Sequence, residues 1–256
     1  DGDDFIDAAF LKHLLDASDR GASDLTVAGK LFCDRFPPDK IPALPTCGIF
    51  LRREFPLKNN LEFPEGIHPC EDGLFSHFVL ALTEKISFCP EAVYHYRQHE
   101  QGNHHQIRKR TADILPMIPR WLSLIEEFYE QRHLWKRKAG HLVRFIEHEP
   151  FELRLLGMPF SPPEQEILYS IIRDFLTAHC TAAECRRASL HLPFRLLLQS
   201  SGFSDFGRRL RRAGKNTGIR RKLLHFCPVP SWRRNGRAQL RQVREQLEEI
   251  RRNITF

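Results

Sequence analysis

Residues 71–97, EDGLFSHFVLALTEKISFCPEAVYHYR, decide the fold class of this 256-residue chain. The first twelve predict a helix over 71–82, because apolar residues recur there at helical spacing. They are Leu74, Phe75, Phe78, Val79 and Leu82. Two short runs that follow, at 86–88 and 93–97, have the composition of strands. A helix that leads directly into strands is typical of α/β architecture.

The residues before this stretch alternate between helix and strand signals in the same way. A helix is predicted to begin at Phe10, with Gly21 as its C-cap. Strands are predicted at 24–29 and 46–52, separated by a proline-rich loop. We therefore expect residues 1–107 to form an α/β domain.

Beyond about residue 108 the strand signals stop and helical patterns take over. Capping boxes at 161–164 and 181–184 predict the starts of two helices. We expect a helical domain at 108–202, ended by Gly202, and then a basic tail at 203–256. The tail contains an apolar seam with alternating spacings of three and four, which predicts an amphipathic helix. Its residues are Leu240, Val243, Leu247, Ile250 and Ile254. This helix would dock on its own domain, form a dimer through residues 240–254, or lie on a membrane surface.

Charge and cysteine content exclude several classes of protein. The chain has a net charge of +7, but residues 201–256 carry 15 Lys and Arg against 4 Asp and Glu. The basic character therefore belongs to the tail, where an acidic partner would bind.

The seven cysteines are scattered without a CxxC pair, which argues against a disulfide scaffold and a zinc ribbon. No run of residues is apolar enough to span a bilayer.

The first candidate site is the acidic segment Asp1-Gly2-Asp3-Asp4. On an extended chain Asp1 and Asp3 point to the same side, because side chains alternate along a strand. Two carboxylates on one side suit Mg²⁺ or Mn²⁺, which bind oxygen ligands and leave positions open for phosphates. The alternative is an acidic segment that caps a helix through Asp4 or Asp7.

Two further clusters carry chemistry. Glu71 and Asp72 lie in the first turn of the predicted helix, whose positive end would keep a carboxylate ionised, as a general base must be. Residues 94–99, YHYRQH, place His95, Arg97 and His99 on one face of a strand. Such a face is cationic or metal-binding in character. The alternatives are an ordinary helix N-terminus and an edge strand with a solvated polar face.

Taken together and in order, these segments resemble the family 2 glycosyltransferases, enzymes of GT-A fold that use nucleotide sugars. DGDDFI (1–6) is similar to that family's DxDD segment, and DLTVAG (24–29) to the strand after the next helix. Four further segments resemble the acceptor-side half of that family's domain in order and spacing. They are GIFLRREF (48–55), NNLEFPEGI (59–67), EDGLFSHFVLAL (71–82) and KISFCPEAVYHYR (85–97).

The resemblance implies a role for each cluster. Asp1 and Asp3 would contact the ribose and the divalent ion on the donor diphosphate, with Asp4 assisting. Asp72 would be the general base that deprotonates the acceptor hydroxyl, and Glu71 would orient the acceptor or that base. His99 would complete the metal shell and Arg97 would hold the diphosphate. The reaction would be an inverting, metal-dependent hexosyl transfer, in which the metal neutralises the leaving group.

The resemblance also implies partners. The donor would be a nucleotide sugar, a UDP-sugar first, and the acceptor a saccharide or a lipid-linked sugar in polysaccharide biosynthesis. The nucleotide-binding half of such a domain would precede the DxDD segment, so the chain is expected to be a fragment with little activity alone. We expect a cytoplasmic protein at the inner face of the membrane, contacted through the basic tail. No nucleic acid is expected as a partner. The alternative function is a non-catalytic helical interaction or membrane-associating module on a degenerate glycosyltransferase remnant.

Overall fold

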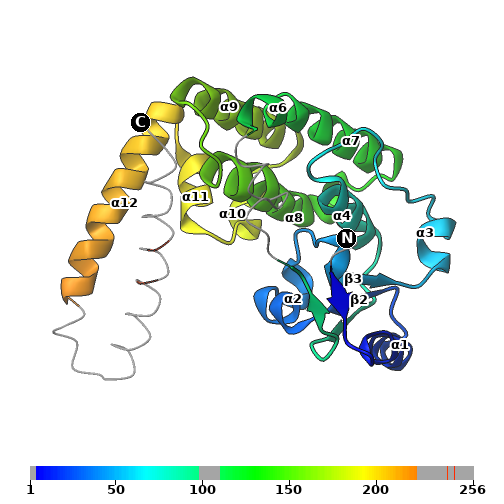
Figure 1. Cartoon of the computed structure of the whole chain (residues 1–256). Helices are drawn as coiled ribbons and strands as arrows, with labels where there is room; N and C mark the ends of the chain where they lie inside the picture. Colours follow the sequence, from blue (N-terminus) through cyan, green and yellow to red (C-terminus); the bar gives the residue numbers. More distant parts are fainter. Residues whose placement is uncertain (1–3, 98–109, 224–240, 242–244, 246–256) are drawn as a thin grey trace. The chain divides into compact units, whose positions relative to one another are not determined.

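A computed structural model describes residues 4–97 and 110–223, together with residues 241 and 245 (Figure 1). The described chain is a mixed α/β protein that is mostly helical, with two small sheets. By its internal contacts the chain divides into two compact units between Glu149 and Pro150. The division falls later than the residue 107 at which the strand signals end, because two long helices after that point pack on the first unit.

The first unit contains all the strands that the structure describes. Its elements in chain order are β1 (Phe5–Ile6), α1 (Phe10–Gly21), β2 (Leu25–Ala28), α2 (Lys30–Arg35), β3 (Ile49–Leu51), α3 (Glu54–Lys58), α4 (Glu71–Leu82), β4 (Ile86–Cys89), β5 (Tyr94–His95), α6 (Thr111–Ile114), α7 (Met117–Gln131) and α8 (Trp135–Ile146). Two 3₁₀ turns, Pro38–Lys40 and Thr46–Gly48, lie between α2 and β3. The fold class predicted from the sequence is confirmed at the level of mixed α/β.

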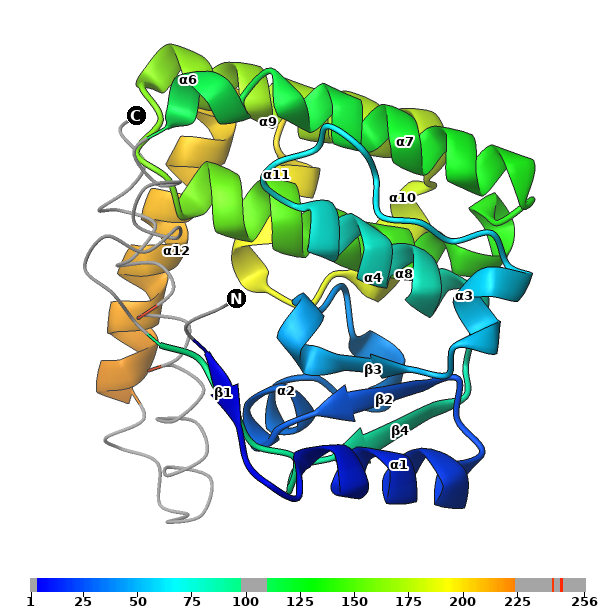
Figure 2. The same ribbon diagram turned by 45° about the vertical axis from the view of Figure 1, so that its right-hand side comes forward.

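The larger sheet has the strand order β3-β2-β4 (Figure 2). Its central strand β2 pairs antiparallel with β3, Thr26 opposite Phe50, and parallel with β4, Thr26 opposite Ser87. All four residues of β2 are buried, as expected of a strand covered on both faces. Helix α1 packs against β2 and β4, and α2 packs against the same two strands. In a second, two-stranded sheet, β1 pairs antiparallel with β5, and each strand contributes two residues.

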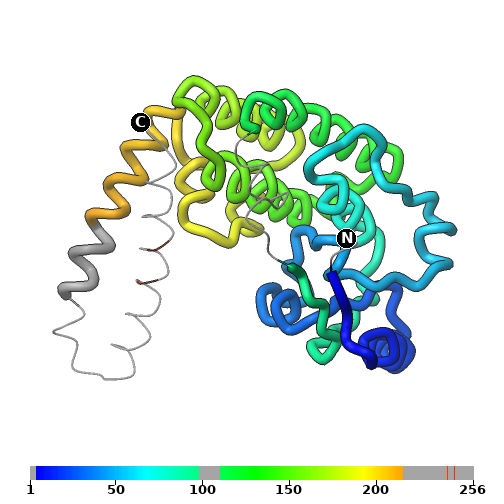
Figure 3. Tube along the Cα trace, viewed as in Figure 1, coloured from blue at the N-terminus to red at the C-terminus, as the bar shows by residue number. Residues whose placement is uncertain are grey.

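Helix α4 is the core of the first unit. Nine consecutive residues, Gly73 to Ala81, are buried, as expected of a helix that is apolar on all sides. It packs on α7 and α8, and stacked rings of Phe78 and Phe128 with centroids 4.1 Å apart join it to α7. From α4 the chain returns through β4 into the larger sheet (Figure 3). The buried helix therefore fixes the position of its own first residues, Glu71 and Asp72.

Among the residues that the structure describes, the second unit consists of helices and the short segments that connect them. A π-helical segment, η3 (Glu147–Leu156), runs into it from the first unit. Its helices are α9 (Pro162–His179), α10 (Ala182–Ala188), α11 (Leu192–Gln199) and α12 (Phe203–Leu223). The predicted capping boxes at Ser161 and Thr181 are confirmed, each with its Glu three residues later. The seam at 240–254 lies outside the continuously described residues, so a dimer through it stays a prediction.

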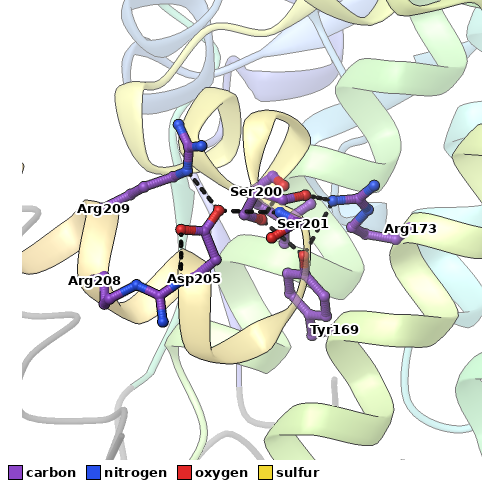
Figure 4. A network of polar contacts seen from close by, with 8 residues as sticks. Tyr169, Arg173, Ser200, Ser201, Asp205, Arg208 and Arg209 are labelled. Carbon is purple, nitrogen blue, oxygen red and sulfur yellow. Dashed lines mark hydrogen bonds and ion pairs between the residues drawn. The ribbon is translucent and has the colours of Figure 1, made fainter.

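Polar contacts fix the start of α12 in the second unit (Figure 4). Asp205 accepts a hydrogen bond from the Ser201 backbone over 3.1 Å and pairs with Arg208 and Arg209 at 3.2 and 2.8 Å. The hydrogen bond from Arg209 is the main reason that the pKa of Asp205 is lowered to about 2. Beside this group the Tyr169 hydroxyl lies 2.7 Å from that of Ser200.

Candidate active site around Asp4 and Asp72

Asp4, at the start of the described chain, is bound to the strand that carries the YHYR motif. Its Oδ2 accepts a hydrogen bond of 2.7 Å from the Tyr94 hydroxyl, and its Oδ1 accepts one of 2.9 Å from the backbone N–H of Arg97. Asp4 and the YHYR strand are therefore neighbours in space, although about ninety residues separate them in the sequence.

The alternative in which this acidic segment caps a helix is wrong. Helix α1 has Ala9 as its N-cap residue, with no side-chain cap. The Asp7 carboxylate instead lies 2.8 Å from Nε2 of His95, and the His95 ring stacks on Phe5 with centroids 4.2 Å apart. The carboxylates of Asp4 and Asp7, which lie on either side of β1, thus contact Tyr94 and His95 of β5.

Arg97 lies beside this cluster. Its guanidinium carbon is 6.0 Å from the centre of the Phe5 ring, within the range of a cation–π contact. The side chain is exposed, so it is open to an anionic ligand. Three of the predicted site residues, Asp1, Asp3 and His99, lie outside the described residues, and their roles stay predictions.

Asp72 lies in the first turn of α4 and is half-buried. Its Oδ1 accepts a 2.8 Å hydrogen bond from the backbone N–H of Gly73, and the Thr46 backbone donates a further bond. Burial is nevertheless the largest influence on its pKa, which is raised above the ordinary value of an aspartate, and the charge of Glu149 adds to the rise. The position at a helix N-terminus alone predicted a readily ionised group. Burial and a neighbouring charge outweigh that effect here.

The residue before this pair has an unusual backbone. Cys70 has φ 89° and ψ 11°, a left-handed conformation that costs a residue other than Gly about 1 kcal/mol or more. Such residues collect at functional sites, where the surrounding structure holds them in place. Glu71 follows directly, and its Oε1 lies 3.2 Å from Nδ1 of His68. The predicted pair Glu71–Asp72 is therefore presented by a strained turn rather than by an ordinary helix start.

The two acidic clusters share a neighbour, the thiol of Cys47. Its pKa is raised chiefly by burial, with contributions from the charges of Asp72 and Asp4. Both carboxylates therefore act on one point of the first unit, although 68 positions separate them in the sequence.

Sequence reasoning missed Glu149. It is 7% exposed, and an ideal Cβ placed on Gly73 would lie 3.2 Å from its Oε1. The carboxylate thus fills the space beside Asp72 that a side chain at position 73 would need. No motif surrounds Glu149, and only the return of the chain through α8 brings it there.

Within the described part of the chain, no three His, Cys, Asp or Glu side chains are grouped so as to hold a metal ion. The sequence matches no protein-family model, and comparison with curated proteins finds no relative.

Proposed function

We propose that this chain carries the acceptor-side half of a metal-dependent, inverting glycosyltransferase of GT-A fold, with Asp72 as the general base. The observation that carries the proposal is the state of Asp72. It is half-buried, held by two backbone N–H groups, and its pKa is raised. A carboxylate whose proton affinity is raised in this way is a better proton acceptor for a sugar hydroxyl than a fully solvated one.

The acidic N-terminal segment would serve the donor. Asp4 is held by Tyr94 and the backbone of Arg97, and the exposed Arg97 guanidinium is suited to a diphosphate. The predicted ligands Asp1 and Asp3 supply carboxylate oxygens, the donor type that Mg²⁺ and Mn²⁺ prefer. A bound ion of this kind would neutralise the charge of the leaving nucleoside diphosphate.

Calorimetric titration of the chain with UDP, with and without Mn²⁺, tests this proposal. We expect binding that needs Mn²⁺, that Asp3→Ala abolishes, and that Asp72→Asn leaves unchanged, because Asp72 acts on the acceptor. The Asp72 variant is thus the matched control for removal of one carboxylate. Absence of Mn²⁺-dependent UDP binding, or equal binding by the Asp3 variant, would overturn the proposal.

Contact with an anionic membrane is proposed for α12. Four of its basic side chains are exposed and recur at spacings of three, one and three, which places them on one face of the helix. They are Arg208, Arg211, Arg212 and Lys215. The buried Phe206 and Leu210 occupy the opposite face. No helix among the described residues is long and apolar enough to cross a membrane.

Sedimentation with vesicles tests this contact. The chain is expected to bind phosphatidylglycerol vesicles at low salt and to be released at high salt, because exposed charges are screened. Phosphatidylcholine vesicles are the control, and Arg211→Gln with Arg212→Gln should weaken the binding. Equal binding to neutral vesicles, or none to either, would refute the membrane contact.

A further inference from the structure

Two carboxylates approach Gly73 from different sides. The Gly73 backbone N–H donates to Oδ1 of Asp72 over 2.8 Å. An ideal Cβ on Gly73 would stand 3.2 Å from Oε1 of Glu149 and 3.5 Å from its Cδ, so the carboxylate lies in close contact with that position. A bare backbone at this position is what lets Glu149 come so near to the first turn of α4.

The site is shielded from solvent. Glu149 is 7% exposed, Gly73 and Leu74 are buried, and Asp72 itself is half-buried. Two negative charges in such surroundings repel each other more strongly than in water, because the effective dielectric constant is lower. The charge of Glu149 therefore favours the protonated form of Asp72.

The other groups that face Asp72 do not cancel this effect. Glu71, the preceding residue, adds another negative charge, whereas the N–H groups of Gly73 and Thr46 favour the ionised form. The thiols of Cys47 and Cys70 lie nearby, and burial raises the pKa of Cys47. The charged side chains with the largest effect on Asp72 are thus both carboxylates, and Glu149 ranks before Glu71.

We propose that Glu149 is a positioning residue for Asp72. The buried negative charge of Glu149 makes Asp72 an effective acceptor for the proton of a sugar hydroxyl. The inference rests on the proposed role of Asp72 as general base. A solvated aspartate, with an ordinary pKa near 4, is a weak base at neutral pH. A second carboxylate beside it makes it a stronger one without contact between Glu149 and the substrate.

The titration of Asp72 in the whole chain tests this role directly. Carbon-13 NMR of chain labelled at the aspartate carboxyl groups, with the Asp72 signal assigned from Asp72→Asn, gives the midpoint without any turnover. In Glu149→Gln the midpoint should move to lower pH, because the charge is removed while the size is kept. The matched control is Glu147→Gln, which removes another buried carboxylate two residues earlier on the same segment. In that variant the midpoint should stay unchanged.

An Asp72 midpoint that is equal in wild type and Glu149→Gln would overturn the proposal, as would an equal shift in both Gln variants. If Glu149→Gln fails to fold, Glu149→Asp replaces it. That variant draws the charge back by one methylene and should lower the midpoint by a smaller amount, and an unmoved midpoint is again fatal. Failure of the glycosyltransferase proposal would appear separately, as loss of Mn²⁺-dependent UDP binding with the midpoint shift intact.

Discussion

The Tyr94 hydroxyl donates a hydrogen bond of 2.7 Å to Oδ2 of Asp4, which ties the first described residue of the chain to strand β5. The backbone N–H of Arg97 holds the other oxygen of the same carboxylate. Two segments about ninety positions apart in the sequence are thus joined by direct bonds. The bond holds the Asp4 carboxylate through a side chain that itself packs against Phe10 of α1.

The Asp4–Tyr94 bond should contribute measurably to stability. Hydrogen bonds to charged groups contribute about 1.5–3 kcal/mol, and partial exposure places this one at the low end. Tyr94→Phe is therefore expected to lower the free energy of unfolding by about 1–2 kcal/mol. Urea denaturation followed by circular dichroism measures the change.

A double-mutant cycle with Asp4→Ala, which removes the accepting carboxylate, separates this bond from other effects of the Tyr94 change. Because the two side chains contact each other directly, the cycle should return a coupling energy of about 1 kcal/mol. Strictly additive single changes would show that the two groups do not interact in solution.

The negative charge of Asp72 should lower the free energy of unfolding. Its pKa is raised in the folded protein, chiefly by burial, so the folded state binds the proton more tightly than the unfolded state. The free energy of unfolding therefore falls as the pH rises from the pKa of the unfolded state, about 3.9, through the pKa of the folded state. The total loss is about 1.36 kcal/mol for each pKa unit by which the two states differ. Above the folded pKa the full cost persists.

Asp72→Asn is accordingly expected to raise the melting temperature at pH 7. The amide oxygen can still accept the hydrogen bond from Gly73, and the gain should vanish near pH 3, where the wild-type carboxyl is protonated in both states. Differential scanning calorimetry at the two pH values checks both statements. A variant less stable than wild type at pH 7 would contradict the raised pKa.

The sequence was sufficient to predict the elements whose pattern is local. The helix predicted over 71–82 is α4, Glu71–Leu82, because its apolar spacing is continuous and a β-extended Thr83 follows it. The strand predicted at 46–52 is shorter, Ile49–Leu51, since Thr46–Gly48 form a 3₁₀ turn after Pro45. Gly21 is the last residue of α1 rather than its C-cap, and the left-handed conformation falls on Ala22.

The candidate site could be predicted only where its residues belong to a motif. Asp4, Asp72 and Arg97 were found in this way, but their partners were not. Tyr94 reaches Asp4 only through the β1–β5 pairing, and Glu149 reaches Asp72 only after the chain has passed through α7 and α8. The direction of the Asp72 pKa shift depends on that burial and that neighbour, neither of which has a local sequence signal.

The capping box at the start of α10 offers a test confined to the second unit. Thr181 accepts a hydrogen bond from the Glu184 backbone over 3.2 Å, and Glu184 binds the Thr181 backbone over 2.8 Å. Thr181→Ala should lower the free energy of unfolding by about 1 kcal/mol, the usual cost of losing an N-cap side chain. Ser161→Ala, in the equivalent position before α9, is the matched comparison and should cost a similar amount. Unchanged denaturation midpoints in both would mean that these caps do not limit stability.

Two stacked histidines in the core should make the first unit sensitive to acid. His77 and His141 are buried with ring centroids 4.2 Å apart, and His77 also binds the Tyr129 hydroxyl at 3.1 Å. Burial lowers the pKa of His141 to about 3 and that of His77 well below its ordinary value. The unfolded state, with a histidine pKa near 6.5, therefore takes up protons that the folded state does not.

The free energy of unfolding should consequently fall as pH drops below 6.5, by up to about 1.4 kcal/mol per pH unit for each histidine. Urea denaturation between pH 7 and pH 5 measures this slope. His141→Gln, whose amide nitrogen can replace Nε2 in the hydrogen bond to the His77 carbonyl, should remove the contribution of one histidine from the slope. His133→Gln, at an exposed position, is the control for loss of a histidine outside the core. Equal slopes in wild type and His141→Gln would contradict the lowered pKa of His141.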